Sequence, residues 1–186
     1  MKYLLLLACL ILCSCSTEEK TPDFYFDEKK FMSEWDIWKN PNIKNYNFTL
    51  DMKDYNYIVS RAKKYYGAPY NYKVEIAVKN DTMDSFKYIG KAPHENGAIV
   101  EPEYTSISDM YQKIYDEIKN HELEFLNRPQ GCTIERRFEI KYNQEFHYIT
   151  HYQPTFGKIS GCSDYTIDFE TSLYEVFISD FTILTP

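Results

Sequence analysis

The sequence lacks several features that mark large classes of protein. Its most apolar run, Tyr3–Leu12, is well short of the roughly 20 residues that a membrane-spanning helix needs. It has only 6 glycines in 186 residues and contains no Gly-x-Ser-x-Gly motif, P-loop or dinucleotide-binding fingerprint. These absences lower the expectation of an enzyme, and the sequence predicts no cofactor.

Positive charge is also scarce. The chain has 21 Lys and Arg against 28 Asp and Glu, a net charge of −7, whereas phosphate binding depends on clustered Lys and Arg. The basic clusters are short and are interpreted as solvated faces: Arg61/Lys63/Lys64 and Arg136/Arg137. We therefore expect neither nucleic acid nor anionic lipid headgroups as partners.

The first residues have the layout of an export signal, in which a positive residue is followed by an apolar run and then by a small residue and a cysteine. Leu12-Cys13-Ser14-Cys15 resembles the lipobox of bacterial lipoproteins, which implies that Cys15 carries lipid. Bulky Leu12 disfavours Cys13 as the acceptor. Cleavage before Cys9 would leave an apolar region shorter than the roughly seven residues that export needs. The alternative is an ordinary secretory signal.

This assignment divides the chain into a signal peptide at 1–14, a lipidated cysteine with a short tether at 15–22, and a single domain at 23–186. Acyl chains of the palmitate type would hold the protein on a membrane, since each buried methylene contributes about 0.8 kcal/mol. We expect a lipid-anchored protein of the bacterial cell envelope. Because Ser16 rather than Asp follows Cys15, the outer membrane is favoured if the cell has two membranes.

Two of the 5 cysteines, Cys132 and Cys162, lie beyond the tether. An even pair in an exported chain predicts a disulfide, and each cysteine follows a glycine where a flexible turn could meet extended chain. Closing the loop between them is expected to stabilise the fold by about 3–4 kcal/mol. The alternative is a pair of free thiols.

Apolar periodicity predicts an α+β domain made mainly of an antiparallel sheet, with two or three helices packed on one face. One helix is expected from Phe24 to Asn40, and a second from about Ser106 to a point before Pro129. Residues 54–66 are ambiguous, and helix is favoured over loop there.

Alternation of apolar and polar residues predicts the strands. Residues 46–52 have the clearest pattern, and hairpins are expected at 72–88 and 132–152. Further strands are expected near 165–169 and 174–183. Residues 90–102 are interpreted as irregular surface.

Six short motifs occur across residues 35–183. They are Trp38, Asn45-Tyr46-x-Phe48-Thr49, Val74-x-Ile76-x-Val78, Ile107-Ser108-Asp109-x-Tyr111, Tyr142-Asn143 and Ile178-Ser179-Asp180-Phe181. Through them the chain resembles a family of small bacterial envelope lipoproteins built around a domain of unknown function. The turn after Val78 departs from the family pattern because it lacks glycine. Since the family has no assigned activity, the resemblance implies location and fold only.

Two histidines, His147 and His151, have the i, i+4 spacing of a zinc-binding helix, but Tyr148 stands where such a helix has its glutamate base. On a strand the two rings would lie about 13 Å apart at a rise of 3.3 Å per residue, too far for one metal. We interpret them as surface histidines and predict no metal.

Carboxylates occur in pairs at Asp81/Asp84 and Asp164/Asp168, but the sequence cannot place either pair across a sugar cleft. Residues 80–85 lack the glycine and the terminal glutamate of a calcium loop and are interpreted as a hairpin turn. No catalytic residue is predicted.

The chain has 18 tyrosines, a residue suited to binding sugars and protein surfaces. Compositional bias, in which aromatic residues replace aliphatic ones in the core, is the competing explanation, and the Phe31/Trp35/Trp38 stripe is interpreted as core. We expect a noncatalytic binding or structural module with an envelope protein or cell-wall partner. The alternative is an envelope hydrolase whose carboxylates the sequence does not identify.

Overall fold

The computed structural model describes residues 24–40, 43–54, 71–95, 97–128, 130–162, 165–167, 171–172 and 174–184. The elements follow the chain as β1 (Phe24–Tyr25), α2 (Glu28–Lys39), β2 (Tyr46–Asp54), β3 (Tyr72–Lys79), β4 (Thr82–Tyr88), β5 (His94–Glu95), β6 (Ala98–Ile99), α3 (Ile107–Leu126), β7 (Thr133–Tyr142), β8 (Ile149–Cys162), β9 (Tyr165–Ile167), β10 (Thr171–Ser172) and β11 (Tyr174–Ile183). The fold is therefore α+β with a mainly antiparallel sheet, as the sequence predicts. The ambiguous segment at 54–66 lies outside the described residues apart from Asp54, which ends β2.

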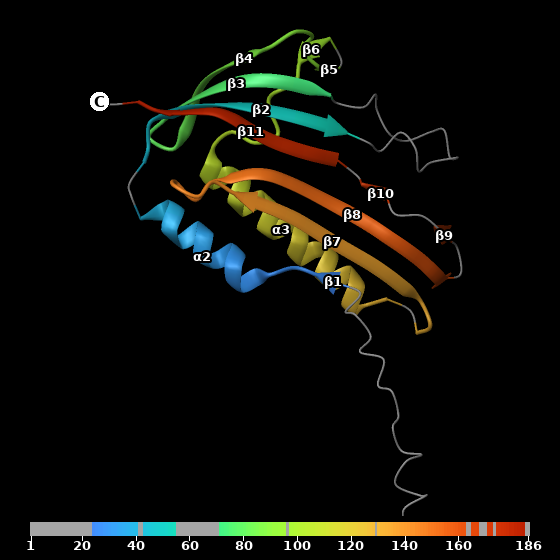
Figure 1. Cartoon of the computed structure of the whole chain (residues 1–186). Coiled ribbons are helices and arrows are strands. Elements are labelled where there is room, and N and C mark those ends of the chain that lie inside the picture. The colour runs from blue at the N-terminus through green and yellow to red at the C-terminus, as the bar shows by residue number, and fades with distance from the viewer. Residues whose placement is uncertain are drawn as a thin grey trace, which may run out of the picture.

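The main sheet has the strand order β1-β7-β8-β11-β2-β3-β4, and β9 and β10 also pair with β8. Its strand pairs are antiparallel apart from β1 with β7. Figure 1 shows that β11, the last strand, lies between β2 and β8 in the middle of the sheet. Strands from the two halves of the chain thus meet along β11.

The β2–β3–β4 meander follows from alternation along each strand. Tyr46, Phe48 and Leu50 of β2 are buried, and the same side of β3 buries Val74 and Ile76. The tight turn after β3 requires left-handed backbone, which Asn80 and Asp81 adopt with φ of 53° and 60°. Asn and Asp tolerate this conformation better than most residues, so the turn forms without the glycine expected from the family pattern.

Helix α2 begins at Glu28, four residues later than predicted. The Asp27 side chain accepts a hydrogen bond from Lys30 N–H at 2.9 Å and caps the first turn. Before this cap, Phe24 and Tyr25 extend and pair in parallel with Arg136 and Arg137 of β7. The prediction was wrong here because the apolar period does not distinguish a helical first turn from a short strand that packs on the same core.

Helix α3 begins and ends as predicted. The Ser106 side chain caps it by accepting from Asp109 N–H at 3.1 Å, and Asp109 Oδ2 accepts from Thr105 N–H at 2.8 Å. One face of the helix is fully buried, and it consists of Ile107, Met110, Tyr111, Ile114 and Ile118.

Strand β8 is longer than predicted, because the expected strand ends near Tyr152 whereas β8 continues to Cys162. Pro154 lies within it, opposite Phe138 of β7. Proline has no N–H for a ladder bond. The described pairing of β8 with β11 involves His151 and Tyr152, so it needs no N–H at position 154. The expected irregular segment at 90–102 also differs, since it contains the small β5–β6 hairpin.

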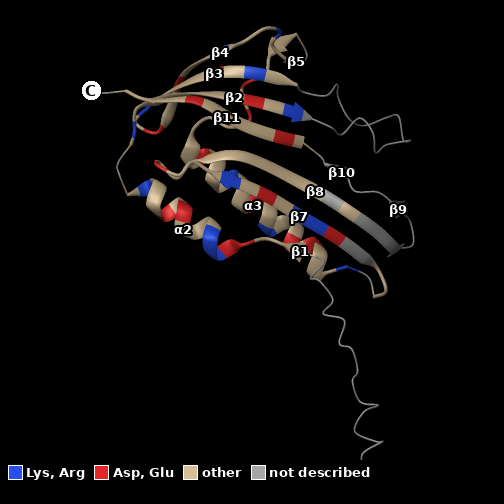
Figure 2. Ribbon diagram, viewed as in Figure 1, with Lys and Arg blue, Asp and Glu red and all other residues tan. Residues whose placement is uncertain are grey.

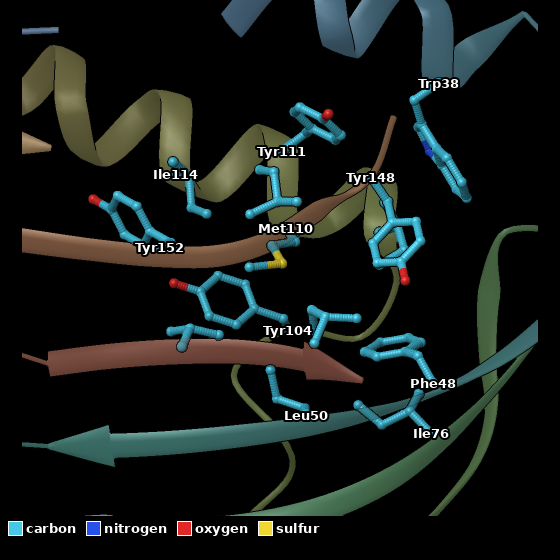
Figure 3. Close-up of a cluster of buried hydrophobic side chains, with 14 of the residues drawn as sticks. Trp38, Phe48, Leu50, Ile76, Tyr104, Met110, Tyr111, Ile114, Tyr148 and Tyr152 are labelled. Atoms are coloured by element: carbon cyan, nitrogen blue, oxygen red, sulfur yellow. The ribbon is translucent and has the colours of Figure 1, made fainter. Parts of the chain in front are cut away.

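The core is rich in aromatic residues, as Figure 3 shows. Phe31 and Trp38 of α2 are buried, and the half-buried Trp35 stacks on Tyr111 with ring centroids 5.6 Å apart. The Trp38 indole N–H donates to Ser108 Oγ at 3.3 Å. The interpretation of the Phe31/Trp35/Trp38 stripe as core is confirmed.

Candidate functional site

A cavity of about 560 Å³ lies where α3 passes the paired ends of β2 and β11. One face of α3 contributes the polar wall, because its residues recur every three or four positions. The cavity is lined by Met52, Glu103, Tyr104, Lys113, Asp116, Glu117, Asn120, His121 and Tyr174.

The centre of this cavity is a tyrosine–carboxylate contact. The hydroxyl of Tyr174, the first residue of β11, donates a hydrogen bond to Glu117 Oε2 on α3. Tyr104 and Tyr152 lie next to this pair and interact with Tyr174. Figure 3 shows the hydroxyls of Tyr104 and Tyr152 directed to the same side, from the loop before α3 and from β8. Three phenols and one carboxylate therefore meet at one place.

These tyrosines are held in the protonated state. Burial raises the pKa of Tyr104 and of Tyr152 well above the ordinary value of 10, and the nearby Glu117 charge adds to this effect. Burial likewise raises the pKa of Tyr174. At neutral pH the three phenols therefore act as hydrogen-bonding groups and not as bases or nucleophiles.

The Tyr152 hydroxyl differs from the other two. The residue is fully buried, and its oxygen has no hydrogen-bond partner of acceptable geometry among the described residues. Leaving a buried hydroxyl unpaired costs about 1–3 kcal/mol. The Tyr152 hydroxyl lies behind the cavity lining, where its neighbours are the Tyr174 hydroxyl and the Glu117 carboxylate.

His121 forms the next part of the same wall. Its Nε2 lies 3.8 Å from Glu117 Oε1, and its Nδ1 lies 3.1 Å from Glu124 Oε2. Burial alone would lower the pKa of His121, but the two carboxylates outweigh it and the pKa is raised above 6.5. The imidazolium form is therefore favoured next to Glu117.

A second hollow, of about 360 Å³, lies on the opposite face of the sheet over β2, β3, β4 and β11. Its charged residues, Glu75, Lys87 and Asp180, are all exposed. Glu103, Lys113 and Asp116 of the first cavity are exposed as well, but that cavity also has the partly buried Glu117 and His121, which makes it the stronger candidate for recognition.

Several residues named by the sequence analysis lie elsewhere or outside the described part of the chain. Cys15, Asp164, Asp168 and the 61–64 basic cluster are outside it. Asp81 accepts a hydrogen bond from the Tyr46 hydroxyl, whereas Asp84 is exposed on β4. The two aspartates serve the hairpin and its surface, and neither lines the tyrosine cavity.

The two late cysteines are brought to the same end of the β7–β8 pair. Thr133 pairs with Ser160, so Cys132 comes one residue before this pair and Cys162 two residues after it. Cys132 is buried, and the Cys162 side chain lies outside the described residues. The disulfide stays a prediction that this strand register supports.

The histidines contact different carboxylates. His147 Nδ1 lies 2.7 Å from Glu34 Oε2, and His151 Nε2 lies 3.0 Å from Glu175 Oε1. Within the described ranges, no group of three or more His, Cys, Asp or Glu could hold a metal ion. The interpretation of both histidines as surface residues is wrong for His151, whose side chain is 5% exposed. Its ring stacks on the ring of Phe177, with the two centroids 4.7 Å apart.

The interpretation of Arg136/Arg137 as a solvated face is wrong for Arg136. Arg137 is exposed and pairs with Glu135 at 2.9 Å, but Arg136 points to the other side of β7 and is buried. Burial lowers its pKa to about 10, although Glu124 acts in the opposite direction. Figure 2 shows acidic and basic residues alternating along β7.

The sequence analysis missed the residues of the tyrosine cavity. A signal was present in Glu117 and His121, which recur at i, i+4 beside the apolar stripe of α3. Tyr104 and Tyr174 carry no local pattern of their own, and only the folded strand order brings them to Glu117.

Comparisons with protein-family models, with curated proteins and with solved structures found no match to this chain. In the part of the chain that the structure describes, no helix is both long and apolar enough to span a membrane.

Proposed function

We propose that this protein is a lipid-anchored bacterial envelope lipoprotein with a noncatalytic binding module, and that the cavity between α3 and β11 is its binding site. The observation that carries the proposal is the convergence of Tyr104, Tyr152 and Tyr174 on Glu117. Three protonated phenols and a carboxylate can orient a ligand by hydrogen bonds, and a volume of about 560 Å³ is in the range of small-ligand sites.

The proposal includes the packing of both helices on one face of the sheet. Two ring contacts support it. The ring centroids of Phe31 on α2 and Tyr111 on α3 lie 5.3 Å apart, and those of Trp38 on α2 and Tyr46 on β2 lie 5.6 Å apart. Such a layer would account for the polar flank of α3 beside the end of β11, where residues of both line the cavity.

Membrane anchoring is supported by the lipobox-like Leu12-Cys13-Ser14-Cys15. Metabolic labelling with palmitate in intact bacteria tests it. We expect label in the wild type and in Cys13→Ala, and none in Cys15→Ala. A Cys15→Ala protein that still matures normally and stays with membranes after alkaline carbonate washing would contradict the anchor.

Ligand binding is tested on the protein purified from its native envelope. Denaturation followed by mass spectrometry should release a small molecule or a bound envelope fragment in stoichiometric amount. Glu117→Gln should lose it, whereas Glu75→Gln, on the opposite exposed face, should retain it. Equal recovery from both variants would place the binding site elsewhere.

A hydrolase is the second candidate, because three carboxylates of the same cavity, Glu103, Asp116 and Glu117, could serve as acid and base. Cell-wall fragments incubated with the wild type and with Glu117→Gln distinguish the two functions. Cleavage by the wild type that is lost in the variant would establish catalysis and overturn the noncatalytic proposal.

A further inference from the structure

The tyrosine cavity has a chemical preference that can be read from its charges and acceptors. We infer that its ligand carries a protonated amine, with Glu117 as the counter-ion. This inference rests on the binding function proposed above and names the class of ligand.

The lining is acidic. It contains three carboxylates, from Glu103, Asp116 and Glu117, and two groups that can be cationic, Lys113 and His121. Carboxylates therefore outnumber cationic groups even when His121 is protonated. Both cationic groups also contact carboxylates outside the lining: Lys113 Nζ lies 3.2 Å from Asp109 Oδ2, and His121 Nδ1 lies 3.1 Å from Glu124 Oε2. His121 Nε2 is farther from Glu117, at 3.8 Å from Oε1, so the shorter contact of the imidazole is with Glu124. The net field in the cavity therefore attracts a cation.

The acceptors at the centre match an ammonium group, which has three donors and no acceptor. Each oxygen of the Glu117 carboxylate can accept more than one hydrogen bond, and the bond from Tyr174 uses part of the capacity of Oε2. Two phenols, those of Tyr104 and Tyr174, line the cavity beside this carboxylate, and the buried Tyr152 hydroxyl interacts with it from behind the lining. An ammonium nitrogen could donate to Glu117 and to the phenol oxygens of the lining together.

The surrounding rings favour the same class of ligand. Tyr152 and Tyr174 pack edge to face with centroids 5.7 Å apart, and aromatic faces attract cations through their quadrupole. Met52 supplies an apolar wall for a carbon skeleton. A small organic amine fits this combination better than a bare inorganic ion, because the apolar wall offers an inorganic ion no ligand atoms.

Pentylamine and pentanol are a matched pair of probes, since they differ only in the group that would meet Glu117. Their binding to the folded protein is measured by amide chemical-shift titration at neutral pH and low salt. We expect pentylamine to shift the signals of Tyr104, Glu117 and Tyr174 in a saturable way, and pentanol to bind at least tenfold more weakly. Equal binding of both probes, or no saturable shift with pentylamine, would overturn the inference.

Two substitutions locate the effect. Glu117→Gln should weaken pentylamine binding at least tenfold, while the exposed control Glu75→Gln leaves it unchanged. Tyr104→Phe, which removes a hydroxyl of the lining, should weaken it severalfold. Unchanged pentylamine affinity in Glu117→Gln would refute the counter-ion role. A neutral molecule released from the native protein would refute the amine class while leaving the binding function intact.

Discussion

The Tyr46 hydroxyl donates a hydrogen bond to Asp81 Oδ1 at 3.1 Å. Its oxygen also accepts the Ile107 N–H at 3.0 Å, at the buried N-terminus of α3. One phenol therefore joins β2, the β3–β4 turn and the start of α3. Burial raises the pKa of Tyr46 far above its ordinary value, so this donor is present at any physiological pH.

Replacing Tyr46 by Phe should lower the free energy of unfolding by about 1–3 kcal/mol, because the buried Ile107 N–H loses its acceptor. Urea unfolding measures the difference. Tyr115→Phe is the control, since its hydroxyl bonds the partly exposed Glu28 at 2.8 Å and should matter less. An equal loss of unfolding free energy in both variants would show that the Tyr46 hydroxyl contributes no more to stability than the Tyr115 hydroxyl.

Truncating the buried face of α3 should be costly. Ile114→Ala removes a fully buried side chain and should cost about 2–5 kcal/mol. Leu123→Ala, on the same helix at 57% exposure, should stay within about 0.5 kcal/mol. Thermal unfolding distinguishes the two variants, because a loss of 1 kcal/mol lowers the melting temperature of a domain of this size by about 2–4 °C. A large effect of Leu123→Ala would mean that another surface covers it.

Reduction should destabilise the protein if Cys132 and Cys162 are bridged. The expected loss is about 3–4 kcal/mol, or a melting temperature lower by about 10 °C. The Cys132→Ser/Cys162→Ser double variant should resemble the reduced wild type and should not respond to reductant. Intact mass after alkylation of the unreduced protein provides the direct check, and two modified thiols would disprove the bridge.

Stability should fall with rising pH through the titration of His121. Its folded pKa is raised above the unfolded value of about 6.5, so protonation favours the folded state. The contribution is complete below pH 6.5 and disappears as the pH rises through the folded pKa. Urea unfolding as a function of pH should show this slope in the wild type and in the exposed control His94→Gln. A slope that persists in His121→Gln would assign the dependence to another group.

Local pattern was sufficient for some elements and not for others. β2, β3 and α3 could be predicted because burial on one face imposes a period of two or of 3.6 residues. The burial of Arg136 was missed because arginine is rarely buried, although Arg136 lies two residues before the buried Phe138 and therefore on the same side of β7. Alternation also carries no information on strand order. The contact between Tyr174 and Glu117, which lie 57 residues apart, therefore had no precursor in the sequence.

The central position of β11 has a consequence for how the chain reaches its final state. β2–β4 and β7–β8 form hairpins from neighbouring segments, whereas β11, the strand that joins them, follows both in the chain. Until it arrives, the two hairpins have no shared ladder, and pairing over such long sequence separations is slow. The β2–β4 and β7–β8 units therefore become one continuous sheet only when β11 has paired with both.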